Sequence, residues 1–324
     1  GREEELASVL GAVSASAPLV LIAGDAGIGK SRLVEQAVAR AGEQGVVVLQ
    51  GRCVGLTGKL PLLPFVEAFK GMDGALAAER VPPSLRSALD VVLHTGSDTS
   101  SREGREQGGR GGEHAGWERE RLVMAVAALL SPPARISPTV LVVEDLHWAD
   151  PFTLDLLTYL VAGTPTGATC VVTVRTDQRP LPEAVLTAVA ELQRLDSTVT
   201  VDLGPLPPEL VAQQVRDVLG QEPSPRIVER LVELGGGNPF FTEQLCRHTE
   251  TADPLGAGSD GGALPPRLSG FLRSRLGGLS EPARRALLVL GVAGVPLSVS
   301  QLSAAAGLTG SDTASAVREL SDAA

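Results

Sequence analysis

Residues 19–31 read LVLIAGDAGIGKS: a short apolar run, a glycine-rich turn, then a lysine and a serine. The last eight of these residues fit the pattern GxxxxGK[ST], and a helical pattern with an apolar side, Ser31–Ala41, follows directly. A buried strand, a tight loop and the start of a helix are the setting that a phosphate-binding loop needs. The stretch therefore predicts an α/β fold with a phosphate site at the end of its first strand.

The chemistry of such a loop follows from its residue types. Glycines let successive backbone N–H groups turn toward one point, where the helix N-terminus adds partial positive charge. We expect Lys30 to reach the β- and γ-phosphate oxygens of a nucleotide, and the Ser31 hydroxyl to bind Mg²⁺. A chance match is the alternative, but lysine occurs at only three positions of the chain, which makes it rare. The candidate nucleotide-binding residues of this segment are Gly24, Asp25, Ala26, Gly27, Ile28, Gly29, Lys30, Ser31 and Arg32.

Short apolar runs alternate with helical patterns as far as residue 203. The runs are rich in β-branched residues and bounded by turn residues: Pro18–Ala23, Val46–Leu49, Thr139–Val143, Thr169–Val174 and Val199–Leu203. The helical patterns are Ser31–Ala41, Glu118–Leu130, Thr153–Val161 and Glu183–Leu195. Near-continuous apolar strands separated by helices are typical of a parallel sheet covered on both faces. The sequence therefore predicts a five-stranded parallel sheet.

Charged residues follow two of these runs. Glu144 and Asp145 come directly after the third, and ligands of open α/β sheets bind beyond the carboxyl ends of strands. Two carboxylates there can hold Mg²⁺ and polarise an attacking water, although a capped strand end is the alternative. Arg175 ends the fourth run and is either a contact for the γ-phosphate or a surface residue that caps the strand. His147 we expect to orient this loop or a neighbouring carboxylate.

Composition excludes several classes of protein. The 324 residues carry a net charge of −10 with a pI near 5.0, which argues against a surface that coats nucleic acid. Hydrophobic residues make up 43%, which excludes a wholly disordered chain. Three scattered cysteines indicate no disulfide framework and suit a reducing cytoplasm. The longest apolar stretch, Ala286–Val299, is too short for a membrane span and contains Pro296. We therefore expect a cytoplasmic location without membrane contact.

The pattern of strands stops after Leu203, and this change predicts a domain boundary. We expect a nucleotide-binding domain over residues 1–204, interrupted by a mobile surface loop at 95–116. A proline-rich connector leads into a second region, 205–263, with helical patterns at Pro208–Leu219, Pro225–Leu234 and Phe240–Glu250. A third region, 264–324, has helix–turn–helix spacing over Gln301–Leu320. The chain begins with Gly1 in place of a methionine, so we expect a segment of a longer protein.

Five motifs in series give a more specific indication: GREEEL (Gly1–Leu6), the phosphate loop, VLVVEDLHWAD (Val140–Asp150), VVTVRT (Val171–Thr176) and GGNPFFTEQL (Gly236–Leu245). Together they resemble the signal-transduction ATPases with numerous domains, the STAND class. More closely, they are similar to the ATPase core of large ATP-binding LuxR-type transcriptional regulators. The resemblance covers nearly the whole chain in the right order.

The resemblance implies further roles for particular residues. Arg2, Glu3 and Pro239 would lie near the adenine, although Pro239 also suits the first turn of a helix. Residues 205–263 would form a helical lid, and 264–324 the start of a winged-helix domain. This chain has Glu144-Asp145 where the family often has two aspartates, so Glu144 takes the Mg²⁺ position and Asp145 the water-polarising one. The longer glutamate side chain leaves that division open.

The function implied is a regulatory switch that binds ATP with Mg²⁺, hydrolyses it slowly to ADP and changes the position of its lid. Lys30, Glu144, Asp145 and Arg175 would be its catalytic residues. Its partners would be ATP, a second copy of the chain when activated, and DNA only through domains outside this chain. The second helix of the third region carries Asp312, Glu319 and Arg318, which hardly suit a helix that reads an anionic DNA groove. A small-molecule phosphotransferase and an ADP-bound scaffold with little turnover are the alternatives.

Overall fold

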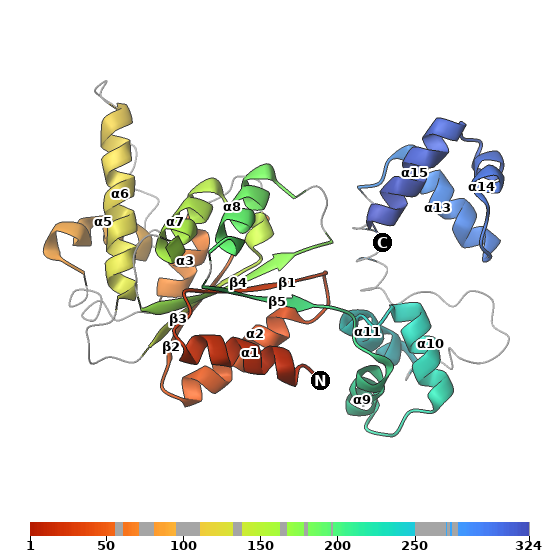
Figure 1. Ribbon diagram of the computed structural model, residues 1–324, viewed down its shortest axis with the longest axis horizontal. Helices are drawn as coiled ribbons and strands as arrows, with labels where there is room; N and C mark the ends of the chain where they lie inside the picture. The colour runs from red at the N-terminus through yellow and green to blue at the C-terminus, as the bar shows by residue number, and fades with distance from the viewer. Residues whose placement is uncertain are drawn as a thin grey trace.

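The structure is a computed structural model of the chain. It describes residues 1–55, 61–70, 81–94, 111–131, 138–162, 167–177, 181–195, 197–249, 270, 273 and 278–323. The first two thirds form a sheet with helices on both faces, and the remainder is helical (Figure 1).

Five parallel strands form the sheet in the order β2-β3-β4-β1-β5. Their bounds are β1 Leu19–Gly24, β2 Val47–Arg52, β3 Thr139–Glu144, β4 Ala168–Arg175 and β5 Thr198–Leu203. The register pairs Gly24 of β1 with Arg175 of β4, and Arg52 of β2 with Glu144 of β3. Gly24, Glu144 and Arg175 therefore lie at the same end of the sheet, where the strands have their carboxyl ends. The prediction of a five-stranded parallel sheet is confirmed.

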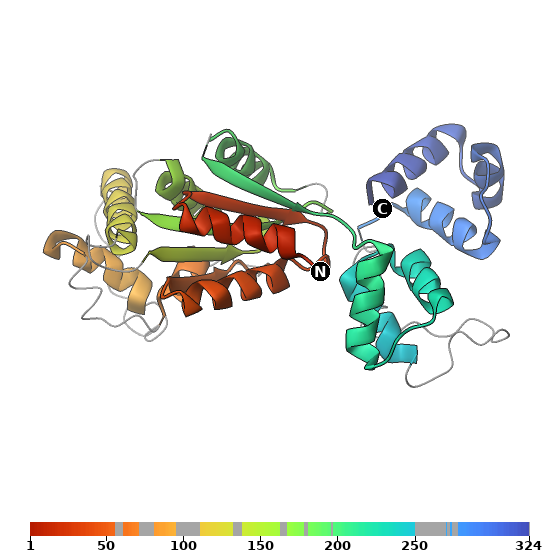
Figure 2. The same cartoon turned by 60° about the horizontal axis from the view of Figure 1, so that its bottom comes forward.

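Alternation along the strands creates two cores. In β1, Leu19 and Leu21 face one core while Val20 and Ile22 face the other, and all four are fully buried. One face is covered by α1 (Glu3–Ser14) and α2 (Lys30–Glu43) (Figures 1 and 2). The opposite face carries α3 (Leu63–Phe69), α6 (Gly111–Leu130), α7 (Pro151–Ala162) and α8 (Glu183–Gln193), with α5 (Pro83–His94) against α3 and α6. Because helices cover both faces in the described part of the chain, the carboxyl ends of the strands are where a ligand of such a sheet would bind.

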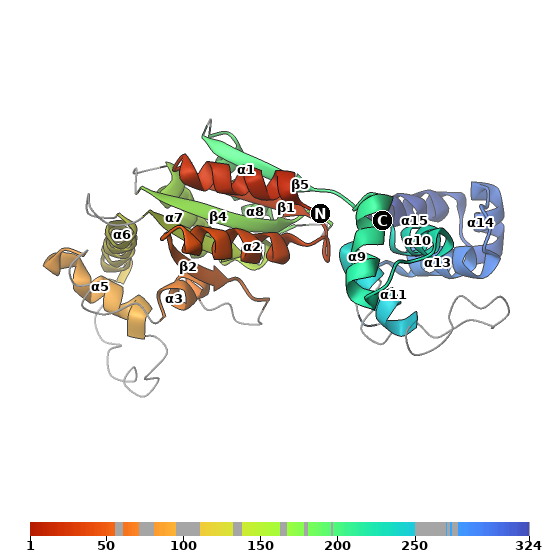
Figure 3. The same cartoon turned by 90° about the horizontal axis from the view of Figure 1, so that it is seen from below.

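The helical remainder has two clusters of its own. In the first, α9 (Pro208–Leu219), α10 (Pro225–Gly235) and α11 (Pro239–Thr249) pack around Val211, Val215, Leu231 and Cys246. In the second, α13 (Glu281–Ala293), α14 (Val299–Ala306) and α15 (Gly310–Ala323) pack around Leu279, Ala283 and Leu302. Figure 3 shows the first cluster beyond the end of the sheet from which β5 leads out. The three helices α9–α11 will be called the lid.

Some expectations differ from the structure. Helix α6 begins at Gly111, so residues 111–116 are helical rather than part of the expected loop; residues 95–110 lie outside the described residues. Helices α1, α3 and α5 were not predicted. The three cysteines are buried thiols, as expected of a chain without a disulfide framework. Within the described ranges, every helix falls short of the length and apolar character that a membrane crossing requires.

Candidate functional site

The loop between β1 and α2 has a backbone that only glycine tolerates at its tight points. Gly24, Gly27 and Gly29 have φ of 152°, 77° and 105°. At Gly27 a Cβ atom would lie 2.7 Å from Cβ of Phe240 at the start of α11. The glycines therefore serve both the turn and the close approach of the lid.

Lys30, the first residue of α2, bonds the loop itself. Its ammonium donates to the carbonyl oxygens of Gly24 and Asp25, each at 2.7 Å, and the residue is 7% exposed. Burial lowers the pKa of Lys30 to about 8, an effect that the negative charge of Asp177 opposes. The predicted phosphate-binding ammonium thus lies inside the loop and bonds carbonyl oxygens there.

Glu144, at the end of β3, is buried and surrounded by donors. Its carboxylate accepts from the Ser31 hydroxyl at 2.6 Å, from Gln50 Nε2 at 2.9 Å and from Arg52 at 3.0 Å. Burial raises the pKa of Glu144, but these three hydrogen bonds outweigh it and leave the pKa below its usual value. A hydroxyl and a carboxylate in contact are oxygen donors of the kind that Mg²⁺ prefers, so the residues present fit that ion.

Asp145 follows Glu144 in a left-handed backbone conformation with φ of 58°. Its N–H donates to the Thr173 hydroxyl of β4 at 2.9 Å, and its carboxylate lies 3.7 Å from the guanidinium of Arg52. Burial raises the pKa of Asp145. The side chain is 31% exposed, so a water molecule can reach it from the open edge.

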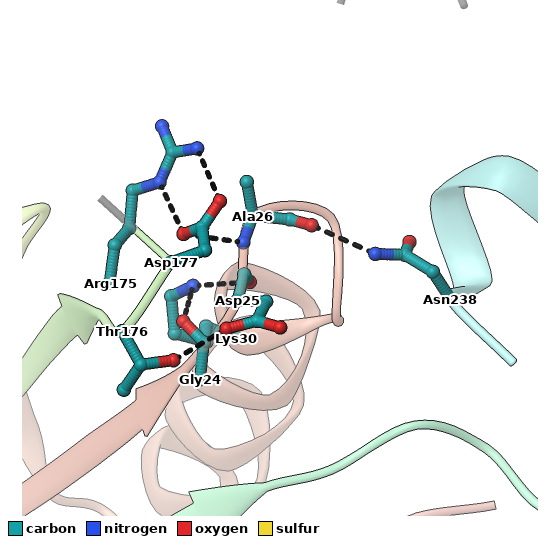
Figure 4. A network of polar contacts seen from close by, with 8 residues as sticks. All are labelled: Gly24, Asp25, Ala26, Lys30, Arg175, Thr176, Asp177 and Asn238. Carbon is teal, nitrogen blue, oxygen red and sulfur yellow. Dashed lines mark hydrogen bonds and ion pairs between the residues drawn. The ribbon is translucent and has the colours of Figure 1, made fainter. Parts of the chain in front are cut away.

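The end of β4 is bonded to the loop (Figure 4). The Arg175 guanidinium makes two 3.2 Å bonds to the Asp177 carboxylate, which also accepts from the N–H of Ala26 at 3.1 Å. The Thr176 hydroxyl donates to Asp25 at 2.6 Å. Arg175 is thereby held at the side of the phosphate loop.

The lid contacts the same loop from the other side. Asn238 Nδ2 donates to the carbonyl of Ala26 at 2.9 Å (Figure 4). The N–H of Phe240 donates to the carbonyl of Gly27 at 3.3 Å. Pro239 lies between these two residues and starts α11, where its carbonyl accepts from Gln214 at 2.8 Å. The lid is therefore attached to the loop through its GGGNPF turn.

Three predicted residues lie apart from this network. Arg2 bonds Glu5 at 2.8 Å and the carbonyl of Gly204, where β5 leaves the sheet. The Glu3 side chain is 79% exposed, and Arg32 is exposed on α2. The structure shows no contact of these three with the loop's polar atoms within the described ranges, and their roles stay predictions.

His147 is the site residue whose surroundings differ most from expectation. It is 1% exposed, and neither ring nitrogen has a hydrogen-bond partner in the described part of the chain. Burial lowers the pKa of His147 to about 4, helped by the positive charges of Arg175 and Lys30. The ring is neutral at pH 7, and its centroid lies 5.2 Å from that of the Trp148 ring. Because neither ring nitrogen has a partner among the described residues, the expected hydrogen bond to a carboxylate is not seen there.

Four further residues of the site were missed: Gln50, Arg52, Asp177 and Asn238. Arg52 had a weaker signal than Arg175, because Gln50 and Gly51 separate it from the apolar run Val46–Leu49, whereas Arg175 follows its run directly. The side chains of Asp177 and Asn238 reach backbone atoms 151 and 212 residues away, contacts that local sequence patterns cannot report.

The sequence of residues 1–172, more than half of the chain, matches the AAA ATPase domain family. The chain belongs to this family. It follows that the loop is that of a nucleotide-binding AAA ATPase domain.

The chain is also similar to a further protein sequence and to solved structures. An uncharacterized protein of Rhizobium meliloti (strain 1021) is 28% identical over 330 residues, which cover 94% of this chain and 30% of that protein. The chain thus spans less than a third of this relative. The Walker-type ATPase of Pyrococcus abyssi shares the fold with a TM-score of 0.54 at 13% identity, over 99% of this chain and 89% of that one. A STAND protein of Pyrococcus horikoshii with a tetratricopeptide repeat sensor is similar with a TM-score of 0.41 at 14% identity, over 100% of this chain and 39% of that one.

Proposed function

We propose that this AAA ATPase domain is a regulatory switch: it binds ATP with Mg²⁺, hydrolyses it slowly to ADP and phosphate, and transmits the difference to the lid. The observation that carries the proposal is the direct bonding of the lid to the phosphate loop through Asn238 and Phe240. A ligand that reorganises this loop must change the bonds that hold the lid. Membership of the family supports nucleotide binding, and the hydrogen bonds between lid and loop support a response of the lid to the bound nucleotide.

The residues have separate parts in the proposed hydrolysis. Lys30 turns from the loop carbonyls to the β- and γ-phosphate oxygens, and the loop N–H groups bind the same phosphates. Ser31 and Glu144 hold Mg²⁺, which when bound would neutralise phosphate charge. Asp145 polarises the attacking water and accepts its proton as the bond from the water oxygen to the γ-phosphorus forms and the bond from that phosphorus to the β–γ bridging oxygen breaks, which releases ADP. Arg175 contacts the γ-phosphate.

The larger context of the switch rests on the motifs. Their resemblance to large ATP-binding LuxR-type regulators supports a role in transcription, with DNA bound by domains outside this chain and self-association in the ATP state. In the third region, Glu319 of α15 accepts from the N–H and hydroxyl of Ser280 at the start of α13. The Glu319 carboxylate thus bonds α15 to the start of α13. This role within the third region supports a function of α15 other than DNA contact.

Two variants test the proposal. In the parent, Mg²⁺·ATP should raise the melting temperature, and Lys30→Met should lose that rise because the phosphates lose their cation. Asp145→Asn should keep the rise and lower single-turnover hydrolysis by at least tenfold, about 1.4 kcal/mol in barrier. Asparagine tolerates the left-handed backbone of residue 145, so the change isolates the charge. A parent without any thermal response to ATP, or unchanged hydrolysis in Asp145→Asn, would contradict the proposal.

A further inference from the structure

Ala26 of the phosphate loop is hydrogen-bonded through the peptide groups on both sides of its Cα. The N–H of Ala26 donates to Asp177, and its C=O accepts from Asn238, at 3.1 and 2.9 Å (Figure 4). Asp177 belongs to the segment after β4, whereas Asn238 belongs to the lid. Ala26 thus connects Asp177, and through it Arg175, with Asn238 of the lid.

The Asp177 side chain is a buried anion among the groups that would bind a phosphate. It is 5% exposed, it forms two bonds with the Arg175 guanidinium, and it accepts from a loop N–H. Its negative charge also acts on the Lys30 ammonium. The Asp177 carboxylate thus balances the charge of Arg175 and accepts hydrogen bonds from Arg175 and the Ala26 N–H. Without it, these groups would need an anionic ligand.

We propose that Asp177 takes the place of the γ-phosphate when no triphosphate is bound. The inference rests on the proposed function, since it assumes that ATP binds this loop. The γ-phosphate of ATP competes with the Asp177 carboxylate for Arg175 and for the Ala26 N–H. ADP lacks that phosphate and leaves both bonds in place. Asp177 is therefore a positioning residue that lets the loop distinguish ATP from ADP.

The replacement of the Asp177 carboxylate by the γ-phosphate also changes the contact between the loop and the lid. When Asp177 releases the Ala26 N–H, the backbone torsions of Ala26 lose a restraint, and the following peptide group, which carries the Ala26 C=O, can move relative to Asn238. ADP produces no such release. The lid bond to Ala26 then depends on the third phosphate, which is the property a switch between ATP and ADP needs.

Calorimetric titrations with a non-hydrolysable ATP analogue and with ADP, both with Mg²⁺, test the inference on the whole chain. Asp177→Asn removes the competing charge and should raise the ratio of ATP to ADP affinity about tenfold. The Asp177→Glu variant keeps the carboxylate and should stay nearer the parent ratio than Asn does. Asp217→Asn, an exposed aspartate of α9, is the matched control and should leave both affinities unchanged.

Other outcomes separate this inference from its premise. Equal changes in both affinities, or a loss of ATP affinity alone, would show that Asp177 only supports the loop and would overturn the inference. A parent that binds neither nucleotide contradicts the proposed function itself. If the Asn variant does not fold, the ¹³Cγ resonance of Asp177 in the parent decides: it should shift with the ATP analogue and not with ADP, and an equal response to both overturns the inference.

Discussion

The charge of Lys30 depends on its burial in the fold. An exposed lysine has a pKa near 10.4, whereas burial in the loop lowers the pKa of Lys30 to about 8. The neutral amine cannot bind phosphate charge, so only the protonated fraction of the empty protein is competent to bind a nucleotide. Phosphate oxygens in turn favour the ammonium and raise the pKa of Lys30 when bound.

This lowered pKa predicts weaker ATP binding in alkaline solution. Below the pKa Lys30 is charged and affinity is constant; above it each pH unit removes most of the competent form. We expect the Kd for Mg²⁺·ATP to be about tenfold higher at pH 9 than at pH 7. Titrations across this range measure it, and circular dichroism at each pH verifies that the protein stays folded. A constant Kd in the folded protein would show that Lys30 keeps its proton when the site is empty.

At the scale of elements, Gly27 joins two parts of the molecule. Its φ of 77° and its contact with Phe240 both require the absence of a side chain. Gly27→Ala should move α11 away from the loop and weaken nucleotide binding at least fivefold, because the new Cβ would lie 2.7 Å from Cβ of Phe240 and 2.9 Å from Asn238 Oδ1. Thermal shift and nucleotide titration measure the two effects.

Gly45→Ala is the matched control for that variant. Gly45 has φ of 80°, nearly that of Gly27, yet a Cβ there would have no atom within 4 Å. Its substitution costs only the backbone strain, about 1–2 kcal/mol. Nucleotide affinity equal in Gly27→Ala and Gly45→Ala would show that the lid contact contributes nothing to binding.

The sequence predicted the helices and strands that are determined by the pattern of residues within their own segment. The central strands β1, β3 and β4 are apolar runs between turn residues, so their burial on two faces is visible in the pattern. Helix α1 also had a signal, since Leu6, Val9 and Val13 repeat at helical spacing and are buried. Helix α3 had little: it has seven residues, and Leu62 precedes it with φ of 60° and no side-chain cap. Its place depends on the sheet, because a Cβ on Gly51 of β2 would lie 1.8 Å from the carbonyl oxygen of Pro64.

The candidate site divides in the same way. The loop, Glu144 and Arg175 follow strands directly and were predicted from their positions. The bonds of Asp177 and Asn238 to Ala26 join segments that meet only after the sheet has formed and β5 has carried the chain back past β1. Propensity and spacing describe neighbours in the chain, so such contacts need the three-dimensional structure.

On the scale of the whole molecule, the sheet and the lid meet at the carboxyl ends of the strands. The chain leaves β5 at Leu203, and Gly204 accepts from Arg2 just before α9 begins. The lid then returns to the sheet's first loop through Asn238 and Phe240. The lid is thus joined to the sheet covalently at β5 and by hydrogen bonds at the phosphate loop, and the second connection lies at the loop that would bind a nucleotide.

Asn238→Ala should remove the bond to Ala26 from that second connection, while the Phe240–Gly27 bond and the covalent connection at β5 remain. A net hydrogen bond contributes about 1 kcal/mol, so we expect the backbone amides at the start of α11, that of Phe240 above all, to exchange with deuterium about fivefold faster. In the parent, ATP should change exchange in both the phosphate loop and α11; in the variant, only in the loop. Gln213→Ala removes an exposed amide of α9 and should behave as the parent does. An α11 that still responds to ATP in Asn238→Ala would show that the signal reaches the lid by another route.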